Sequence, residues 1–293
     1  MNLNQLKSER PVFDENAAAR AGARWNNLAK PVGSLGLLER AVAAIAGVQG
    51  TDRPAIGKRA VLILCADNGV TAQGVASTPP QITSVMAEFI ARKRSAVCIM
   101  AKKADVESIA VDIGMFCRVE EPGLLDRRIA DGTADITLGP AMTREQAMRA
   151  VETGIELARS CKAQGYQILA TGEMGIGNTT TSSAVSSVLL GKRPADMTGS
   201  GAGLDEAGLM RKVSAIERAI AVNRPDEADP VDVLAKVGGF DIAGLAGVFL
   251  GGALYRVPVI VDGFISATAA LAAARIWPEA QKAMLFKIGR AHV

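Results

Sequence analysis

One short stretch of the chain combines the residue types that a nucleotide-binding site needs. It reads Gly172-Glu173-Met174-Gly175-Ile176-Gly177-Asn178-Thr179-Thr180-Thr181. An apolar run of strand length precedes it, and a run of small and aliphatic residues follows it as far as Leu190. A strand, a glycine turn and a helix in this order point backbone N–H groups at an anion. The stretch therefore predicts a site for a phosphorylated ligand.

The members of this turn suit different parts of such a ligand. Gly175 and Gly177, on either side of Ile176, let the backbone approach a ligand or take positive φ. Asn178 and Thr179 can cap the helix and donate to phosphate oxygens. Glu173 is different, because a carboxylate repels phosphate and suits ribose hydroxyls or a developing cation better.

Acidic residues also follow other predicted strands. Asp67-Asn68 comes after the apolar run 60–66, and Asp262 comes after the strand 257–261. The carboxyl ends of parallel strands meet at one edge, where open α/β sheets bind ligands. Together with Glu173, these carboxylates would hold ribose hydroxyls or would only cap neighbouring helices, and spacing alone does not choose. Nothing in the spacing demands a divalent metal, and we expect no metal and no cofactor.

A single lysine is a further candidate. Lys212 falls on a predicted helix that Asp205 caps and that continues to residue 222. It is either a phosphate partner or an ordinary solvent-exposed helix lysine.

The elements that must position these residues alternate between strand and helix. We predict strands at 60–66, 106–113, 166–170 and 257–261, and helices at 14–30, 37–48, 81–102, 143–162, 181–190, 205–222, 242–254 and 264–276, with an irregular excursion at 118–140. This alternation favours an α/β fold: a parallel, Rossmann-like sheet flanked by helices. We expect a small helical N-terminal part at 1–50 and a nucleotide-binding core at 51–293. The small residues of 242–254 would suit a close helix contact, within the chain or in a dimer.

Composition excludes several classes of protein. The net charge is only +3 and no basic run reaches five residues, which argues against nucleic acid as a partner. The N-terminus lacks an apolar signal core and no run of eighteen apolar residues occurs, so we expect neither secretion nor a membrane span. The four cysteines form no Cys-x-x-Cys pair, which indicates buried free thiols in the cytoplasm. The only histidine is His292, which leaves no basis for a histidine triad or a histidine-ligated zinc.

Five motifs in order resemble one family. They are 29–36, 65–70, 172–180, 238–244 and 261–266, which contain in turn Lys30-Pro31-Val32-Gly33, Ala66-Asp67-Asn68-Gly69, the glycine turn, Gly238-Gly239-Phe240-Asp241 and Val261-Asp262-Gly263. From about residue 15 to 286 the chain is similar to the nicotinate-nucleotide–dimethylbenzimidazole phosphoribosyltransferases of cobalamin biosynthesis. The resemblance implies transfer of phosphoribose from nicotinate mononucleotide to a benzimidazole, without a cofactor, by a homodimer.

The resemblance also implies roles for single residues. It puts Glu173 beside the ribose and the leaving nicotinate, the turn 175–179 along the nucleotide, and Lys212 near the phosphate. The segment from Ser77 to Met86 would line the base pocket. There Val85, with Met86 beside it, stands where the family often has Gln, and Asn68 stands where the family often has His.

The family's sequence continues for several dozen residues past Phe286. That part holds a further phosphate loop and a Leu-Gly-Glu-Gly-type stretch whose glutamate is the catalytic base, and neither string occurs here. Residues 287–293 do not resemble the family. The sequence therefore leaves two hypotheses, an active phosphoribosyltransferase and a nucleotide-binding remnant without activity. A dehydrogenase is a weak third, because the turn lacks Gly-x-Gly-x-x-Gly and its acidic partner.

Overall fold

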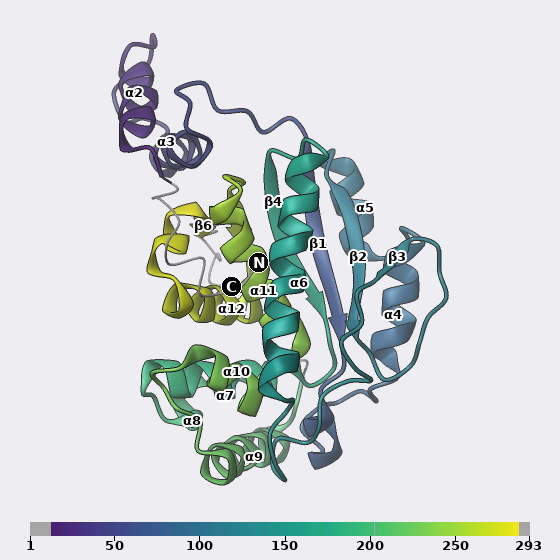
Figure 1. Cartoon of the computed structure of the whole chain (residues 1–293). Helices are drawn as coiled ribbons and strands as arrows, with labels where there is room; N and C mark the ends of the chain where they lie inside the picture. Colours follow the sequence, from purple (N-terminus) through teal and green to yellow (C-terminus); the bar gives the residue numbers. More distant parts are fainter. Residues whose placement is uncertain (1–12, 202, 287–293) are drawn as a thin grey trace.

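The computed structural model describes residues 13–201 and 203–286, which form a six-stranded parallel sheet in the order β3-β2-β1-β4-β5-β6 (Figure 1). The strands are β1 (Arg59–Ala66), β2 (Glu107–Gly114), β3 (Leu124–Asp126), β4 (Ile168–Met174), β5 (Val259–Val261) and β6 (Met284–Phe286). The first three strands proceed outward from β1, and the next three proceed from β4 on its other side. This is the Rossmann order, so the predicted fold class is confirmed.

Helices cover both faces of the sheet. They are α2 (Glu15–Asn26), α3 (Leu37–Gln49), α4 (Ile82–Ala91), α5 (Ala96–Lys103), α6 (Arg144–Ala163), α7 (Asn178–Leu190), α8 (Pro194–Met197), α9 (Glu206–Asn223), α10 (Pro230–Val237), α11 (Phe240–Leu254) and α12 (Phe264–Ile276), with short 3₁₀ turns η1 (Gly69–Gln73) and η2 (Pro278–Ala283). None of these helices is long and apolar enough to cross a membrane.

Strand β1 is apolar throughout because both of its faces are buried. Ile63 and Cys65 pack on the side of α4 and α5, whereas Leu62 and Leu64 pack on the side of α6 and α11. Successive side chains of a strand point to opposite faces, so one continuous apolar run fills two cores.

The glycine-rich helix α11 is buried within the chain, against α6. A Cβ at Gly247 would lie 1.9 Å from the Val151 carbonyl oxygen, and a Cβ at Gly154 would lie 1.9 Å from the Gly244 carbonyl oxygen. Only glycine allows the two backbones to approach so closely. The small residues of 242–254 therefore serve contacts inside this chain, which is the first of the two alternatives that the sequence left open.

The first two described helices, α2 and α3, pack on each other and lie apart from the sheet (Figure 1). The segment between α3 and β1 is tied down by Gln49. Its amide nitrogen donates to the carbonyl oxygens of Ala55 at 2.8 Å and Gln167 at 3.0 Å, and its amide oxygen accepts from the Ala55 N–H at 2.9 Å.

Three expectations about elements need correction. The helix expected at 81–102 is two helices, because Lys93 takes a left-handed conformation (φ 59°) between α4 and α5. The excursion at 118–140 contains the edge strand β3, and β6 was not expected at all. Strand β4 continues past Ala170 to Met174, so Glu173 belongs to the strand itself. The expectations for residues 1–12 and 287–293 lie outside the described residues.

Candidate active site

The sheet order changes direction between β1 and β4, and this switch point is where ligands of such folds bind. Asp67 and Asn68 directly follow β1, and Glu173 lies in β4, where it pairs with Leu64. The fold thus brings together three of the residues that the sequence predicted.

Glu173 is linked to two further side chains by a single amide. The Asn178 Nδ2 donates to Glu173 Oε2 at 2.5 Å and to Asp241 Oδ2 at 2.9 Å. Burial raises the pKa of Glu173, and the hydrogen bond from Asn178 opposes that rise. Asn178 therefore stabilises the ionised form of the glutamate.

Sequence reasoning gave Asp241 no role. It lies at the start of α11 with no exposed surface, and burial, with the nearby Glu173 charge, raises its pKa to about 7. The signal that points to it is an acid directly after Gly238-Gly239-Phe240 and directly before an apolar run.

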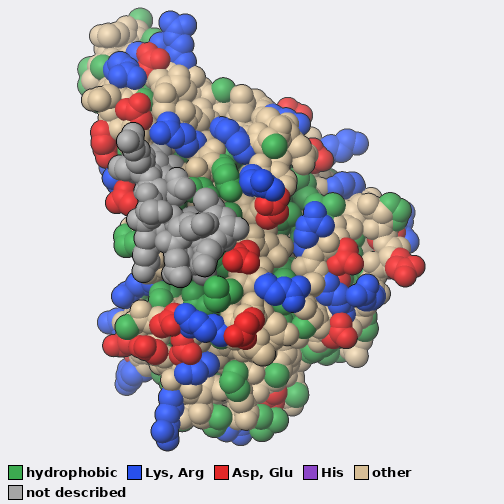
Figure 2. Space-filling view, in the orientation of Figure 1, with side chains coloured by type: hydrophobic (Ala, Val, Ile, Leu, Met, Phe, Trp, Pro, Cys, Tyr) green, Lys and Arg blue, Asp and Glu red, His purple; other side chains and the backbone are tan. Residues whose placement is uncertain are grey.

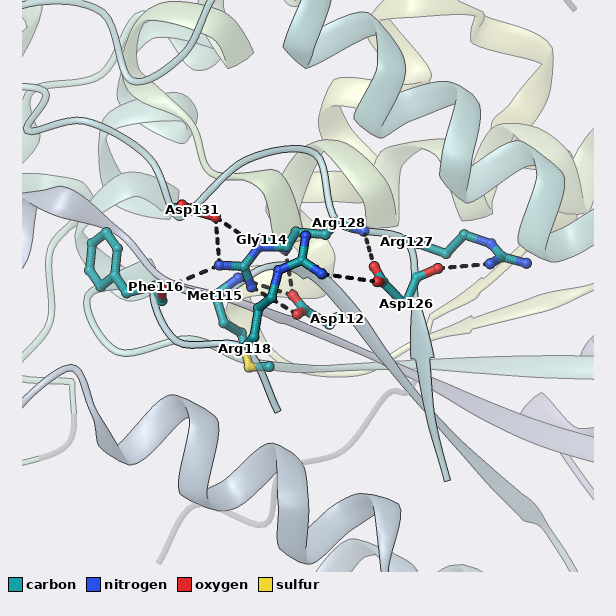
Figure 3. A network of polar contacts seen from close by, with 9 residues as sticks. All are labelled: Asp112, Gly114, Met115, Phe116, Arg118, Asp126, Arg127, Arg128 and Asp131. Carbon is teal, nitrogen blue, oxygen red and sulfur yellow. Dashed lines mark hydrogen bonds and ion pairs between the residues drawn. The ribbon is translucent and has the colours of Figure 1, made fainter. Parts of the chain in front are cut away.

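Asp67 is held by the loop that follows β2. Its Oδ2 accepts from the Phe116 N–H at 2.8 Å, and the Phe116 carbonyl oxygen accepts from Arg128 at 3.2 Å. Arg128 also pairs with Asp112 at 3.0 Å and Asp131 at 2.7 Å (Figure 3). Burial raises the pKa of Asp67, while the nearby Thr83 hydroxyl and the Phe116 N–H lower it. Sequence reasoning missed Arg128, which lies in the segment that was expected to be irregular.

Asn68 is fully buried and forms part of the protein frame. Its Oδ1 accepts from the Thr181 hydroxyl at 3.0 Å, whereas its Nδ2 has no partner among the described residues. Asp67 Oδ1 likewise has none in the described part of the chain. Buried polar atoms normally have a partner, so these two atoms are candidates for contacts with a ligand.

The first turn of α7 contacts Lys212, the lysine that the sequence offers as a phosphate partner. Lys212 is only 1% exposed, and its Nζ donates to Thr179 Oγ1 at 2.8 Å and to the Gly199 carbonyl oxygen at 3.3 Å. Burial lowers its pKa to about 8. No described carboxylate forms an ion pair with it, so a buried cation here lacks an anion. The alternative of a solvent-exposed helix lysine is wrong.

The glycine turn departs from expectation in its caps. Gly177, with φ 93°, is the N-cap of α7, and neither Asn178 nor Thr179 caps the helix by its side chain. A Cβ at Gly177 would lie 2.8 Å from Thr71, so the protein itself requires a glycine here. The Ile176 N–H donates to Thr83 Oγ1 at 3.1 Å, which joins the turn to α4.

Four other residues that the sequence predicted for the site lie nearer the protein surface. Asp262 follows β5 and is exposed, as is Ser77 in the loop before α4. On α4, Val85 is 44% exposed and Met86 is half-buried. The described contacts do not join these four side chains to Glu173.

Three other features concern the surroundings of the site. Burial raises the pKa of the Cys65 thiol, and the charges of four carboxylates add to that rise: Asp112, Glu173, Asp241 and Asp67. No group of three or more potential ligands in the described ranges has an arrangement that could hold a metal ion. A cavity of about 780 Å³ lies at the amino ends of β1 and β2, away from the carboxyl ends that carry Asp67 and Glu173. It is lined in part by Lys58, Lys93, Lys102 and Tyr166, and none of the predicted site residues lines it.

A Rossmann-type sheet with carboxylates at its switch point is the arrangement typical of α/β proteins that bind nucleotides. A family model described as phosphoribosyltransferase matches residues 11–292. The chain belongs to this phosphoribosyltransferase family.

Named relatives agree with this membership. The chain is 48% identical over 272 residues to the nicotinate-nucleotide–dimethylbenzimidazole phosphoribosyltransferase of Ruminiclostridium cellulolyticum, a match that covers 93% of this chain and 77% of that protein. It is 48% identical over 256 residues to the protein of the same name from Acetivibrio thermocellus, covering 87% and 73%. The crystal structure of CobT from Thermus thermophilus superposes with a TM-score of 0.88 at 38% identity, covering 92% of this chain and 81% of that one.

Proposed function

We propose that the protein transfers the phosphoribosyl group of nicotinate mononucleotide to 5,6-dimethylbenzimidazole. The products are α-ribazole 5′-phosphate, used for the lower ligand of cobalamin, and nicotinate. The observation that carries the proposal is that the first turn of α7 joins two opposite charges. Thr179 contacts the buried Lys212, and the neighbouring Asn178 contacts the half-buried Glu173. A phosphate suits the lysine, and a positively charged reacting sugar suits the glutamate. Nothing in the comparisons favours the alternative of a remnant without activity.

The reaction fits a site made of carboxylates. The benzimidazole nitrogen forms a bond to the anomeric carbon while the bond to the pyridinium nitrogen breaks, and its electron pair returns to the leaving ring. The pyridine nitrogen leaves neutral, so its departure needs no acid, and positive charge develops on the sugar. The benzimidazole gives up the proton of its other nitrogen to water as the new bond forms, so the ring of the product is neutral. A fixed carboxylate stabilises that charge in a water-poor site. Glu173 has this role in the proposal, and Lys212 with the N–H groups at 175–179 holds the phosphate.

The outer residues complete the proposed site. Asp67, Asn68 and Asp262 would contact the ribose or the incoming base, and the segment Ser77–Met86 would line the base pocket. The contact between Thr83 and Ile176 supports this, because it fixes α4, which carries Val85 and Met86, against the turn.

Turnover by the chain tests the proposal directly. Product formation from the two substrates is followed by chromatography for the wild-type protein and for Glu173→Gln, which keeps the shape and removes the charge. We expect the variant to be slower by about 10²–10³-fold, as is typical for the loss of one electrostatic stabiliser. Equal rates would remove Glu173 from catalysis, and no product from the wild-type chain would contradict the proposed function.

The base pocket allows a separate prediction. Val85 offers no hydrogen bond to a polar base edge, so 5,6-dimethylbenzimidazole should outcompete adenine as the substrate. Val85→Gln should reduce the ratio of the two rates by about tenfold, which is the effect expected of roughly one hydrogen bond. Competition between the two bases measures it. Ile99→Gln, an exposed apolar position on α5, is the matched control and should change nothing. An unchanged preference in Val85→Gln would place Val85 outside the pocket.

We also propose that the protein is a cytoplasmic homodimer that binds neither nucleic acid nor membrane. All four cysteines are free thiols, three buried and Cys117 exposed, which suits a reducing compartment. On the face shown in Figure 2, basic and acidic side chains are interspersed, which does not suit a polyanion. Exposed apolar side chains such as Phe89 and Met100 support association. Sedimentation equilibrium measures the oligomeric state.

A further inference from the structure

Two glycines from distant parts of the chain make room for one buried carboxylate. A Cβ at Gly175 would lie 2.9 Å from Asp241 Oδ2, and a Cβ at Gly239 would lie 2.5 Å from Asp241 Oδ1. Burying a carboxylate is unfavourable unless its hydrogen bonds compensate. Asp241 fills this space without any exposed surface. Its position therefore calls for a reason beyond packing.

The hydrogen bonds of Asp241 supply that reason. Its Oδ1 accepts from the Ile242 N–H at 2.9 Å, which fixes the carboxylate at the start of α11. Its Oδ2 accepts one hydrogen of the Asn178 amide, and the other hydrogen of that amide is donated to Glu173. A flipped amide would turn its carbonyl oxygen toward two carboxylates, which is repulsive. Asp241 thus determines which way Asn178 faces.

We propose that Asp241 is a positioning residue that acts on the reaction through Asn178 and Glu173. It holds the Asn178 amide so that one N–H stays on Glu173, which keeps the glutamate charged and in place for the reacting sugar. The inference rests on the role of Glu173 in the proposed function. It assigns to Asp241 no contact with substrate.

A double-mutant cycle tests the inference. Asp241→Asn keeps the shape but replaces one of the two acceptor oxygens by an NH2 donor, so the side chain can no longer accept from both Asn178 and Ile242. We expect kcat to fall by about 10–100-fold, with KM for nicotinate mononucleotide changed less than about threefold. In a Glu173→Gln background the same change should cost less than about twofold, since residues that act as a unit are not additive. An equal loss in both backgrounds would mean a merely structural role and would overturn the inference.

A control and a second variant keep the test decisive. Asp229→Asn makes the same chemical change at the cap of α10, where Asp229 accepts from the Val231 and Asp232 N–H groups, and its effect should be the same in both backgrounds. Asn178→Ser breaks the link from its other end, so it should reproduce the fall in kcat and its dependence on Glu173 even if Asp241→Asn does not fold. Wild-type turnover by Asn178→Ser would overturn the inference.

A structural measurement separates this inference from the proposed function. In a crystal structure of Asp241→Asn, the Asn178 amide should leave Glu173, beyond hydrogen-bonding distance. If the Asn178–Glu173 contact stays at its wild-type length of 2.5 Å, Asp241 does not orient the amide, whatever the enzyme's activity. If the contact is lost but the wild-type chain makes no product, only the proposed function fails.

Discussion

Lys212 is a cation that the fold buries without an anion among the described residues, and this predicts its contribution to binding. Lys212→Met keeps the length and removes the charge. Affinity for nicotinate mononucleotide should fall by about 10–150-fold, the worth of a hydrogen bond to a charged group. Affinity for the riboside that lacks the phosphate should not change. Calorimetry with both ligands measures this, and an equal loss for both would place Lys212 away from the phosphate.

The lowered pKa of Lys212 adds a pH dependence to the wild-type protein. The free protein has its Lys212 mostly neutral above pH 8, whereas a bound phosphate favours the charged form. Binding at pH 9 should therefore take up a proton, and binding at pH 6.5 should take up none at Lys212. Calorimetry in two buffers of different ionisation enthalpy measures the uptake, which Lys212→Met should abolish.

Asp241 should affect stability in the opposite direction to a salt-bridged carboxylate. Its pKa is about 7 in the folded protein and 3.8 ordinarily, so between these values the folded state binds more protons than the unfolded state. The contribution of Asp241 to the free energy of unfolding is present at low pH and is lost as the pH rises from 4 to 7. The loss is at most about 1.4 kcal/mol per pH unit. Asp241→Asn should flatten this part of the curve, and the raised pKa values of Asp67 and Glu173 should leave a smaller slope. Urea unfolding at pH 5 and 7.5 measures the difference, and an unchanged slope would contradict a raised pKa at Asp241.

At the scale of the elements, replacing a glycine by alanine should lower the free energy of unfolding in one helix and raise it in another. Gly247→Ala in α11 places a methyl 1.9 Å from the Val151 carbonyl oxygen and should cost about 1–3 kcal/mol or more. Gly22→Ala in α2 meets nothing within 4 Å and should stabilise by up to about 1 kcal/mol through helix propensity. Denaturant unfolding of both variants decides this. A neutral Gly247→Ala would mean that α6 and α11 can separate without loss.

Most elements could be predicted because their signals are local. The helix that begins after Thr143 and the cap at Asp205 both stand where the sequence put them. The helix break at Lys93 and the three-residue strands β3 and β6 depend on tertiary contacts, which no local pattern contains. The same division holds for the site. Asp67 and Glu173 could be predicted because they lie at the ends of apolar strands. Asp241 and Arg128 could not, because they lie at a helix start and in a loop.

At the scale of the whole molecule, the division into a helical part at 1–50 and a core at 51–293 remains a proposal. The side chain of Gln49 holds the segment between them by hydrogen bonds to Ala55 and Gln167. Gln49→Ala should therefore increase several-fold the rate at which a nonspecific protease cleaves within 51–58, while the rate of turnover stays within about twofold of the wild type. Arg20→Ala, at an exposed position on α2, is the control and should cleave like the wild type. Cleavage spread evenly over the chain would contradict a boundary near residue 50.

The contact between α6 and α11 has a consequence for the timescale on which the site can rearrange. Residues 154 and 247 are distant in sequence, and their backbones meet too closely for either helix to slide past the other. The amide hydrogens of α11 should therefore exchange with solvent only when the whole molecule opens. Asp241 lies in the first turn of that helix, so the orientation of Asn178 shares the lifetime of the folded state and need not be re-established at each catalytic cycle.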